Sequence, residues 1–173
     1  MKNINWNNVP NPTELPRLGP GGYICKITMV KDVPEKEYLY LEYDIAEGQH
    51  KRHWNELYKA KSFWGGKFYR SYKETALSMF KGFLTAVKDS NPGFIFNNEE
   101  KRLEGQLIGL VLGEEEYRKQ DGSDGTRLYV AAVRSLDKIR SGDFIVPPKK
   151  LLQTGRSDGF YPTNDVPDDD VPF

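Results

Sequence analysis

Cations and aromatic rings alternate between His50 and Lys73. Seven lysines and arginines in this stretch face one acidic residue, Glu56, and the same stretch holds seven aromatic side chains. Cations along a phosphate track and flat rings that accept unstacked bases are the two ingredients of binding to single-stranded nucleic acid without sequence preference. The pattern therefore predicts a single-stranded DNA site.

The candidate site extends beyond this stretch. Tyr38 and Tyr40 alternate with the apolar Leu39 and Leu41, so both rings are expected on the face opposite the buried one. Further cations flank a turn near residue 121. The predicted DNA-contacting residues are Tyr38, Tyr40, Lys51, Arg52, Trp54, Lys59, Lys61, Trp64, Lys67, Tyr69, Arg70, Arg118, Lys119 and Arg127.

Some of these rings have an alternative place in the core. Large aromatic side chains are mostly buried in folded proteins. For Trp54 and Phe68 a core position is as compatible with the sequence as a DNA contact. The cations, equally, could form an ordinary solvated surface.

Charge is distributed unevenly along the chain. The 25 basic and 25 acidic side chains cancel overall. Residues 156–173 contain one arginine and five aspartates, which leaves 24 basic and 20 acidic side chains in residues 1–155. A basic body joined to an acidic tail favours a polyanionic ligand.

The last nine residues, Asp165–Phe173, combine aspartates with Val171, Pro172 and Phe173. Carboxylates suit a basic rim, a phenyl ring suits a pocket, and a C-terminal carboxylate suits an arginine or an amide nest. The alternative is an acidic, solubilising tail. We expect a peptide that partner proteins bind, with the contacts made by Asp168, Asp169, Asp170, Val171, Pro172 and Phe173.

The sequence Asp168-Asp-Asp-Val-Pro-Phe173 resembles the acidic tip of bacterial and phage single-stranded DNA-binding proteins, with valine where isoleucine is commoner. The Pro-rich lead of about twenty residues departs from the cellular bacterial members, so the resemblance points to a divergent, phage-type member. In that family the tip recruits replication, recombination and repair proteins. A homo-oligomer is among the partners compatible with this resemblance.

Enzymatic chemistry has weaker signals. His50 and His53 lack a third zinc ligand at convincing spacing. The carboxylates of Glu114, Glu115 and Glu116 would alternate in direction along a strand and converge poorly on a metal. We expect no catalytic residues, no metal and no cofactor.

The expected elements are five strands and one helix. Strands are predicted over residues 23–30, 37–45, 51–58, 103–117 and 127–134. Ser71 and Glu74 form a capping-box pattern before a helix that carries apolar residues from Ala76 to Val87, and Asn91-Pro92-Gly93 ends it. Asp121–Gly125 is expected to be a turn.

Three strands, a helix and two strands predict an all-β fold with one helix: an OB-fold, the five-stranded Greek-key barrel. A mixed α+β sheet or another small barrel remains an alternative. We expect a lead at 1–21, the single-stranded DNA-binding domain at 22–154 and a disordered acidic tail at 155–173.

One cysteine, Cys25, excludes an intramolecular disulfide and fits a reducing compartment. Neither a signal region nor a membrane-spanning run is evident. The expected protein is cytoplasmic, coats and protects single-stranded DNA in replication and recombination, and recruits partners through its tip. The alternatives are a protein-binding adaptor and a small DNA-processing enzyme.

Overall fold

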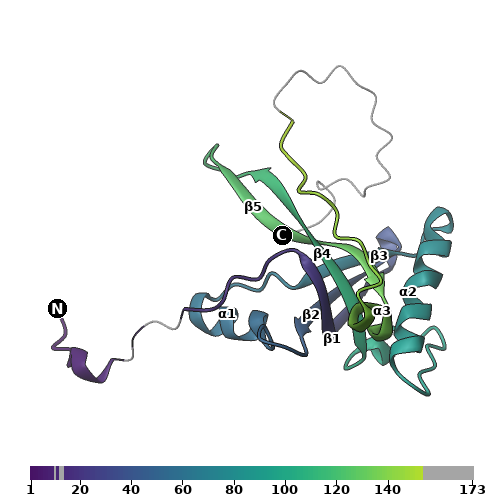
Figure 1. Cartoon of the computed structure of the whole chain (residues 1–173), viewed down its shortest axis with the longest axis horizontal. Coiled ribbons are helices and arrows are strands. Elements are labelled where there is room, and N and C mark those ends of the chain that lie inside the picture. Colours follow the sequence, from purple (N-terminus) through teal and green to yellow (C-terminus); the bar gives the residue numbers. More distant parts are fainter. Residues whose placement is uncertain (10, 12–13, 154–173) are drawn as a thin grey trace.

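The structure, a computed structural model, describes residues 1–9, 11 and 14–153 (Figure 1). The acidic segment with the expected partner-binding residues Asp168–Phe173 lies outside this part of the chain. No helix in the described ranges is long and apolar enough to cross a bilayer.

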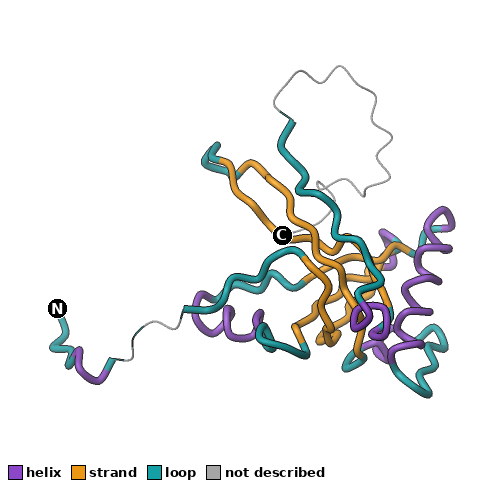
Figure 2. Tube along the Cα trace, viewed as in Figure 1, coloured by secondary structure: helices purple, strands orange, loops and turns teal. Residues whose placement is uncertain are grey.

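A five-stranded antiparallel sheet forms the body (Figure 2). Its strand order is β3-β2-β1-β4-β5, so β1 pairs with both β2 and β4, and the sheet is open. The mostly sheet character predicted from the sequence is confirmed, whereas closure into a barrel is not seen. The strands are β1 (Gly21–Val33), β2 (Tyr38–Ile45), β3 (Lys67–Ser71), β4 (Leu107–Arg118) and β5 (Asp124–Arg134).

Alternation places one face of β2 in the core, as predicted. Leu39, Leu41, Tyr43 and Ile45 are all buried. Helix α2 (Leu77–Ser90) covers this inner face, because its apolar side chains recur at helical spacing. The ring of Phe83 lies 6.2 Å from that of Phe68 on β3, measured between centroids.

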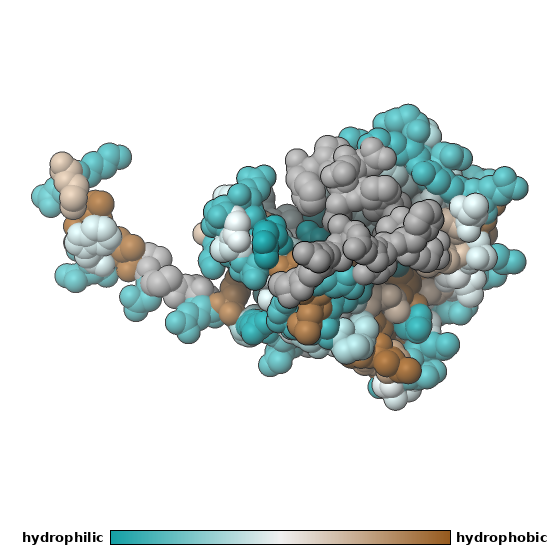
Figure 3. Space-filling model, turned by 90° about the horizontal axis from the view of Figure 1, so that it is seen from above, coloured by the Kyte–Doolittle hydropathy of each residue, from teal (hydrophilic) through white to brown (hydrophobic). Residues whose placement is uncertain are grey.

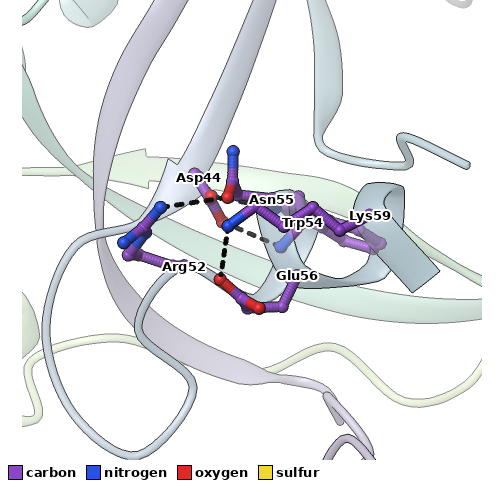
Figure 4. Close-up of polar contacts among 6 residues, drawn as sticks. All are labelled: Asp44, Arg52, Trp54, Asn55, Glu56 and Lys59. Carbon is purple, nitrogen blue, oxygen red and sulfur yellow. Dashed lines mark hydrogen bonds and ion pairs between the residues drawn. The ribbon is translucent and has the colours of Figure 1, made fainter. Parts of the chain in front are cut away.

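The predicted strand at 51–58 is wrong, because this segment is helix α1 (His53–Lys61). Its N-terminus is satisfied from another element (Figure 4). The buried carboxylate of Asp44 on β2 accepts hydrogen bonds from the backbone N–H groups of Trp54 (2.9 Å) and Asn55 (3.1 Å). A carboxylate at a helix N-terminus satisfies otherwise unpaired donors and complements the helix dipole.

The start of α2 also differs from prediction. A single 3-10 turn, η3 (Glu74–Ala76), precedes the helix, and no side chain caps the N-terminus of α2. The hydroxyl of Ser71 instead accepts from the backbone N–H of Lys73 at 3.2 Å. The capping-box prediction is therefore wrong, whereas the helix and its end at Asn91 are confirmed.

After β5, helix α3 (Leu136–Ser141) and residues 142–152 run back over the outer face of β1 and β4. We call residues 142–152 the C-terminal strap. The ring of Phe144 lies directly on Gly22, where any Cβ atom would collide with it. Near its end, Lys150 exchanges backbone hydrogen bonds with Glu114 and Glu116 of β4. The strap therefore covers the outer face at Gly22 of β1 and then pairs with β4 through a parallel bridge at Glu115.

The lead is anchored at one end only. Leu18 is buried in the core cluster, ahead of the expected domain start at residue 22, and Arg17 pairs with Glu114 at 2.8 Å. Residues 1–9, with the short turn η1 (Trp6–Asn8), project away from the sheet and carry apolar side chains (Figures 1 and 3). We call residues 1–9 the N-terminal arm.

The remaining 3-10 turns are η2 (Pro34–Lys36) and η4 (Glu100–Leu103).

Candidate nucleic-acid interface

Three tyrosines gather on the outer face of β2 and β3, and we call them the tyrosine strip: Tyr38, Tyr40 and Tyr69. Tyr40 and Tyr69 are cross-strand partners, so both side chains leave the sheet on the same side. Their ring centroids are 5.4 Å apart, and those of Tyr38 and Tyr69 are 5.5 Å apart. The strip is a continuous aromatic surface on the face opposite the core.

The three rings are not equally accessible. Tyr38 is only 5% exposed, whereas Tyr40 and Tyr69 are partly exposed. The predicted outward direction of Tyr38 is therefore right, yet Tyr69 lies edge-on against it at an interplanar angle of 84°. Tyr40 and Tyr69 are the rings that a base can reach, and Tyr38 supports them.

The hydroxyl of Tyr40 is fixed within the sheet. It donates to Oε1 of Glu42, two residues along the same strand, at 2.8 Å. Burial, and then this carboxylate, raise the pKa of Tyr40 far above its ordinary value. The phenol thus stays neutral at physiological pH, and its hydrogen bond limits movement of the ring.

Lysines lie in register with the strip. Lys31 of β1 is opposite Tyr40, and it is exposed. Lys67 of β3 is opposite Glu42, one row further along the same face. Cations on both flanks of partly exposed rings are the arrangement that a phosphate backbone with stacked bases requires.

A second group of cations follows the end of β2. Lys51, Arg52, Lys59 and Lys61 are all exposed on or before α1. Two of them have partners on the helix: Arg52 donates to Asn55 at 3.1 Å, and Lys59 pairs with Glu56 at 3.4 Å (Figure 4). Exposed contacts of this kind contribute little to stability, so they hold these cations only weakly.

Trp64 lies between α1 and β3. Its indole Nε1 donates to the backbone oxygen of Gly66 at 3.0 Å, and the side chain is partly exposed. The ring is thereby held just before β3, three residues ahead of Lys67. Trp64 also packs against the hydrophobic core, so the structure does not join its ring to the tyrosine strip.

Two predicted contacts lie on the core side instead. Trp54 is 6% exposed and packs edge-on against Tyr43, 6.5 Å away between centroids. The guanidinium of Arg70 lies over the ring of Phe68 at 5.0 Å, on the face that α2 covers. Burial lowers the pKa of Arg70 to about 10. The core alternative for Trp54 and Phe68 is thus the one the structure adopts.

The three remaining candidates are on the β4–β5 hairpin, which is separated from the strip by β1 in the sheet order. Arg118 pairs with Asp124 at 3.3 Å, and Lys119 is exposed beside the turn. Arg127 pairs with Glu115 at 2.8 Å and lies over the ring of Tyr117 at 5.1 Å.

The hairpin also carries two rings that the sequence analysis missed, Tyr117 and Tyr129. Lys150 of the strap lies 4.2 Å from the centroid of the Tyr129 ring, which covers Gly113 on the opposite strand. Arg127 and Tyr129 are two residues apart on β5, so their side chains leave the sheet on the same face. Because Arg127 was already a candidate, this alternation is the signal that could have found Tyr129.

The acidic run on β4 is divided among different cations. Glu114 pairs with Arg17, Glu115 with Arg127 and Glu116 with Lys149 at 3.3 Å. Within the described part of the chain, no group of three or more His, Cys, Asp and Glu side chains is placed to hold a metal ion. The histidines His50 and His53 lie edge-on, 6.2 Å apart between ring centroids.

Comparison with protein-family models and with curated proteins finds no match to this sequence.

Proposed function

We propose that the protein binds single-stranded DNA non-catalytically, coats and protects it during replication or recombination, and recruits partner proteins through its acidic tip. The observation that carries the proposal is the pair of partly exposed rings, Tyr40 and Tyr69, flanked by Lys31 and Lys67 on the outer face of β2 and β3. Rings of this kind stack on any base, because every base has an aromatic face.

The strand order supports an OB-type body. A first strand that pairs with both the second and the fourth, and a helix between the third and the fourth, match an OB barrel opened between β3 and β5. OB-folds bind oligonucleotides on the face of strands two and three. The tyrosine strip occupies that face, which supports the same site.

The tail part of the proposal depends on sequence alone. Residues 168–173 resemble the partner-binding tip of the single-stranded DNA-binding proteins. An aromatic anchor beside carboxylates suits a pocket with a basic rim. Partners of the replication, recombination and repair machinery are the expected binders.

A gel-shift experiment separates this function from its rivals. The full chain is titrated into labelled oligo(dT), a duplex of equal length and a matching RNA. We expect oligo(dT) to bind much more tightly than the duplex, with no change in DNA length. Absence of binding to all three would favour a protein-binding adaptor, whereas cleavage of the DNA would favour a processing enzyme.

A further inference from the structure

The N-terminal arm carries apolar side chains that the body of the same molecule does not cover. Trp6 is 64% exposed, and Ile4 and Val9 are exposed as well. Figure 3 shows hydrophobic residues, in brown, along an arm that stands clear of the body of the molecule. A tryptophan exposed on a projecting segment is typical of an interface anchor, since tryptophan is among the residues that contribute most to protein–protein binding.

A cavity of about 590 Å³ opens at the base of this arm. Its walls come from residues 14–18 of the lead, from α1 and from β5, with Leu15, Trp54, Leu57, Ala60 and Leu128 among the lining residues. Apolar side chains dominate the walls, and His53, Arg17, Glu14 and Lys61 supply the polar groups. A pocket of this size and character accepts one or two large apolar side chains.

The N-terminal arm points away from the cavity of its own molecule (Figure 1). Residues 14–18 form one wall, so the arm leaves from the edge of the pocket that it would have to re-enter. Pro16 restricts this wall, because proline fixes its own φ and biases the preceding residue toward extended backbone. The arm itself stands away from the body, and the side chain of Trp6 is exposed there (Figure 1).

We propose that the arm of one copy inserts Trp6 into this cavity of a second copy. Arm and cavity are different surfaces, so the contact is heterologous: each copy offers one arm and one cavity. Such contacts continue from copy to copy into an open chain unless the rotation closes a ring. The inference concerns self-association without DNA and is independent of the proposed function. An open chain along a strand would make DNA coating cooperative.

Sedimentation velocity over a range of protein concentrations, without DNA, tests the contact. We expect the mass of the wild-type chain to rise with concentration. Trp6→Ala, which removes the anchor, and Ala60→Glu, which places a carboxylate at the exposed helix position lining the cavity, should each weaken self-association by at least about tenfold. Phe63→Ala, at an exposed ring outside the arm and the cavity, is the matched control and should behave as wild type.

Mixing the two variants provides the sharper test. Trp6→Ala retains a cavity and Ala60→Glu retains an arm, so the mixture should form 1:1 dimers that grow no further, although each variant alone stays monomeric. A monomeric wild-type chain would overturn the proposal, as would association that Ala60→Glu leaves intact or a mixture that stays monomeric. Tighter packing of Trp6 within its own monomer, seen as quenching or a blue shift without any change in mass, would overturn it too.

Discussion

Tyr40 and Tyr69 are the two residues on which DNA binding should depend most. Each ring is partly exposed and is supported by its neighbour across the strands. We expect Tyr40→Ala and Tyr69→Ala each to weaken oligo(dT) binding by about 1–3 kcal/mol, because each removes one stacking surface. Fluorescence anisotropy with labelled oligo(dT) measures the loss. Met79→Ala on α2, which removes an exposed apolar side chain elsewhere, should leave the affinity unchanged.

Tyr38 should behave differently from its two neighbours, although the sequence pattern treats Tyr38 and Tyr40 alike. Its side chain is almost fully buried beneath Tyr69. Tyr38→Ala should therefore lower the melting temperature, with a loss of DNA affinity only through the displaced Tyr69. A Tyr38→Ala chain that melts like wild type but no longer binds oligo(dT) would show that Tyr38 contacts the bases directly.

The residue-level prediction succeeded where strand alternation decides burial and failed where a partner distant in sequence does. Alternation gave the outward face of Tyr40 correctly. It could not reveal that Tyr69 covers Tyr38, because that contact needs the register of β2 on β3. Likewise, nothing near Arg70 in the sequence indicates that Phe83 of α2 lies 5.9 Å from its guanidinium.

Helix α1 depends on a cap supplied by another element. Two backbone N–H groups at its start bond to Asp44, so Asp44→Ala should destabilise the chain by about 1–2 kcal/mol, the usual cost of losing an N-cap. Urea unfolding measures the change. Glu47→Ala, which removes an exposed pair with Arg140, is the control and should cost at most about 1 kcal/mol. Equal losses for the two variants would contradict the cap.

The same helix should respond to acid through His53. Burial, and next the nearby His50, lower the pKa of His53 below its ordinary value of 6.5. The unfolded chain then binds a proton more readily than the folded one, so stability falls as the pH drops below about 6.5 and levels off below the folded pKa. Melting temperatures between pH 7.5 and 5 should show this fall, and His53→Gln should reduce it. An unchanged slope in the variant would rule out His53 as the source.

Because the cap of α1 comes from Asp44 on another element, the sequence around α1 did not indicate a helix, and the segment was predicted as a strand. The segment lacks a local N-cap, and Arg52, at the cap position, is in the left-handed region at φ 63°. Trp54, Leu57 and Tyr58 do recur at helical spacing, but they are the only large apolar side chains among the nine residues of α1. In contrast, the strong apolar periodicity of α2 made that helix predictable even though its start was misplaced.

At the scale of the molecule, the acidic tail should have two separate roles. It should compete with DNA for the basic body, and it should recruit partner proteins. Five aspartates tethered to a body with a net charge of +4 act at high effective concentration. Removing Asp165–Phe173 should tighten oligo(dT) binding at low salt and abolish capture of replication and repair proteins. Deleting Phe173 alone should abolish capture and leave DNA affinity nearly unchanged. Pull-downs in which both truncations recover the same proteins as the full chain would contradict recruitment.

The salt dependence of oligo(dT) affinity tests the central claim most directly. A face whose cations neutralise several phosphates should lose affinity for single strands as salt rises, with a log–log slope of about −0.7 for each phosphate neutralised. We predict a slope of several units for the wild-type chain. Lys31→Ala should make the slope shallower by less than one unit, whereas Tyr40→Ala should lower the affinity without changing the slope. An oligo(dT) affinity that does not vary with salt, or that Tyr40→Ala and Tyr69→Ala leave untouched, would contradict single-stranded DNA binding on this face.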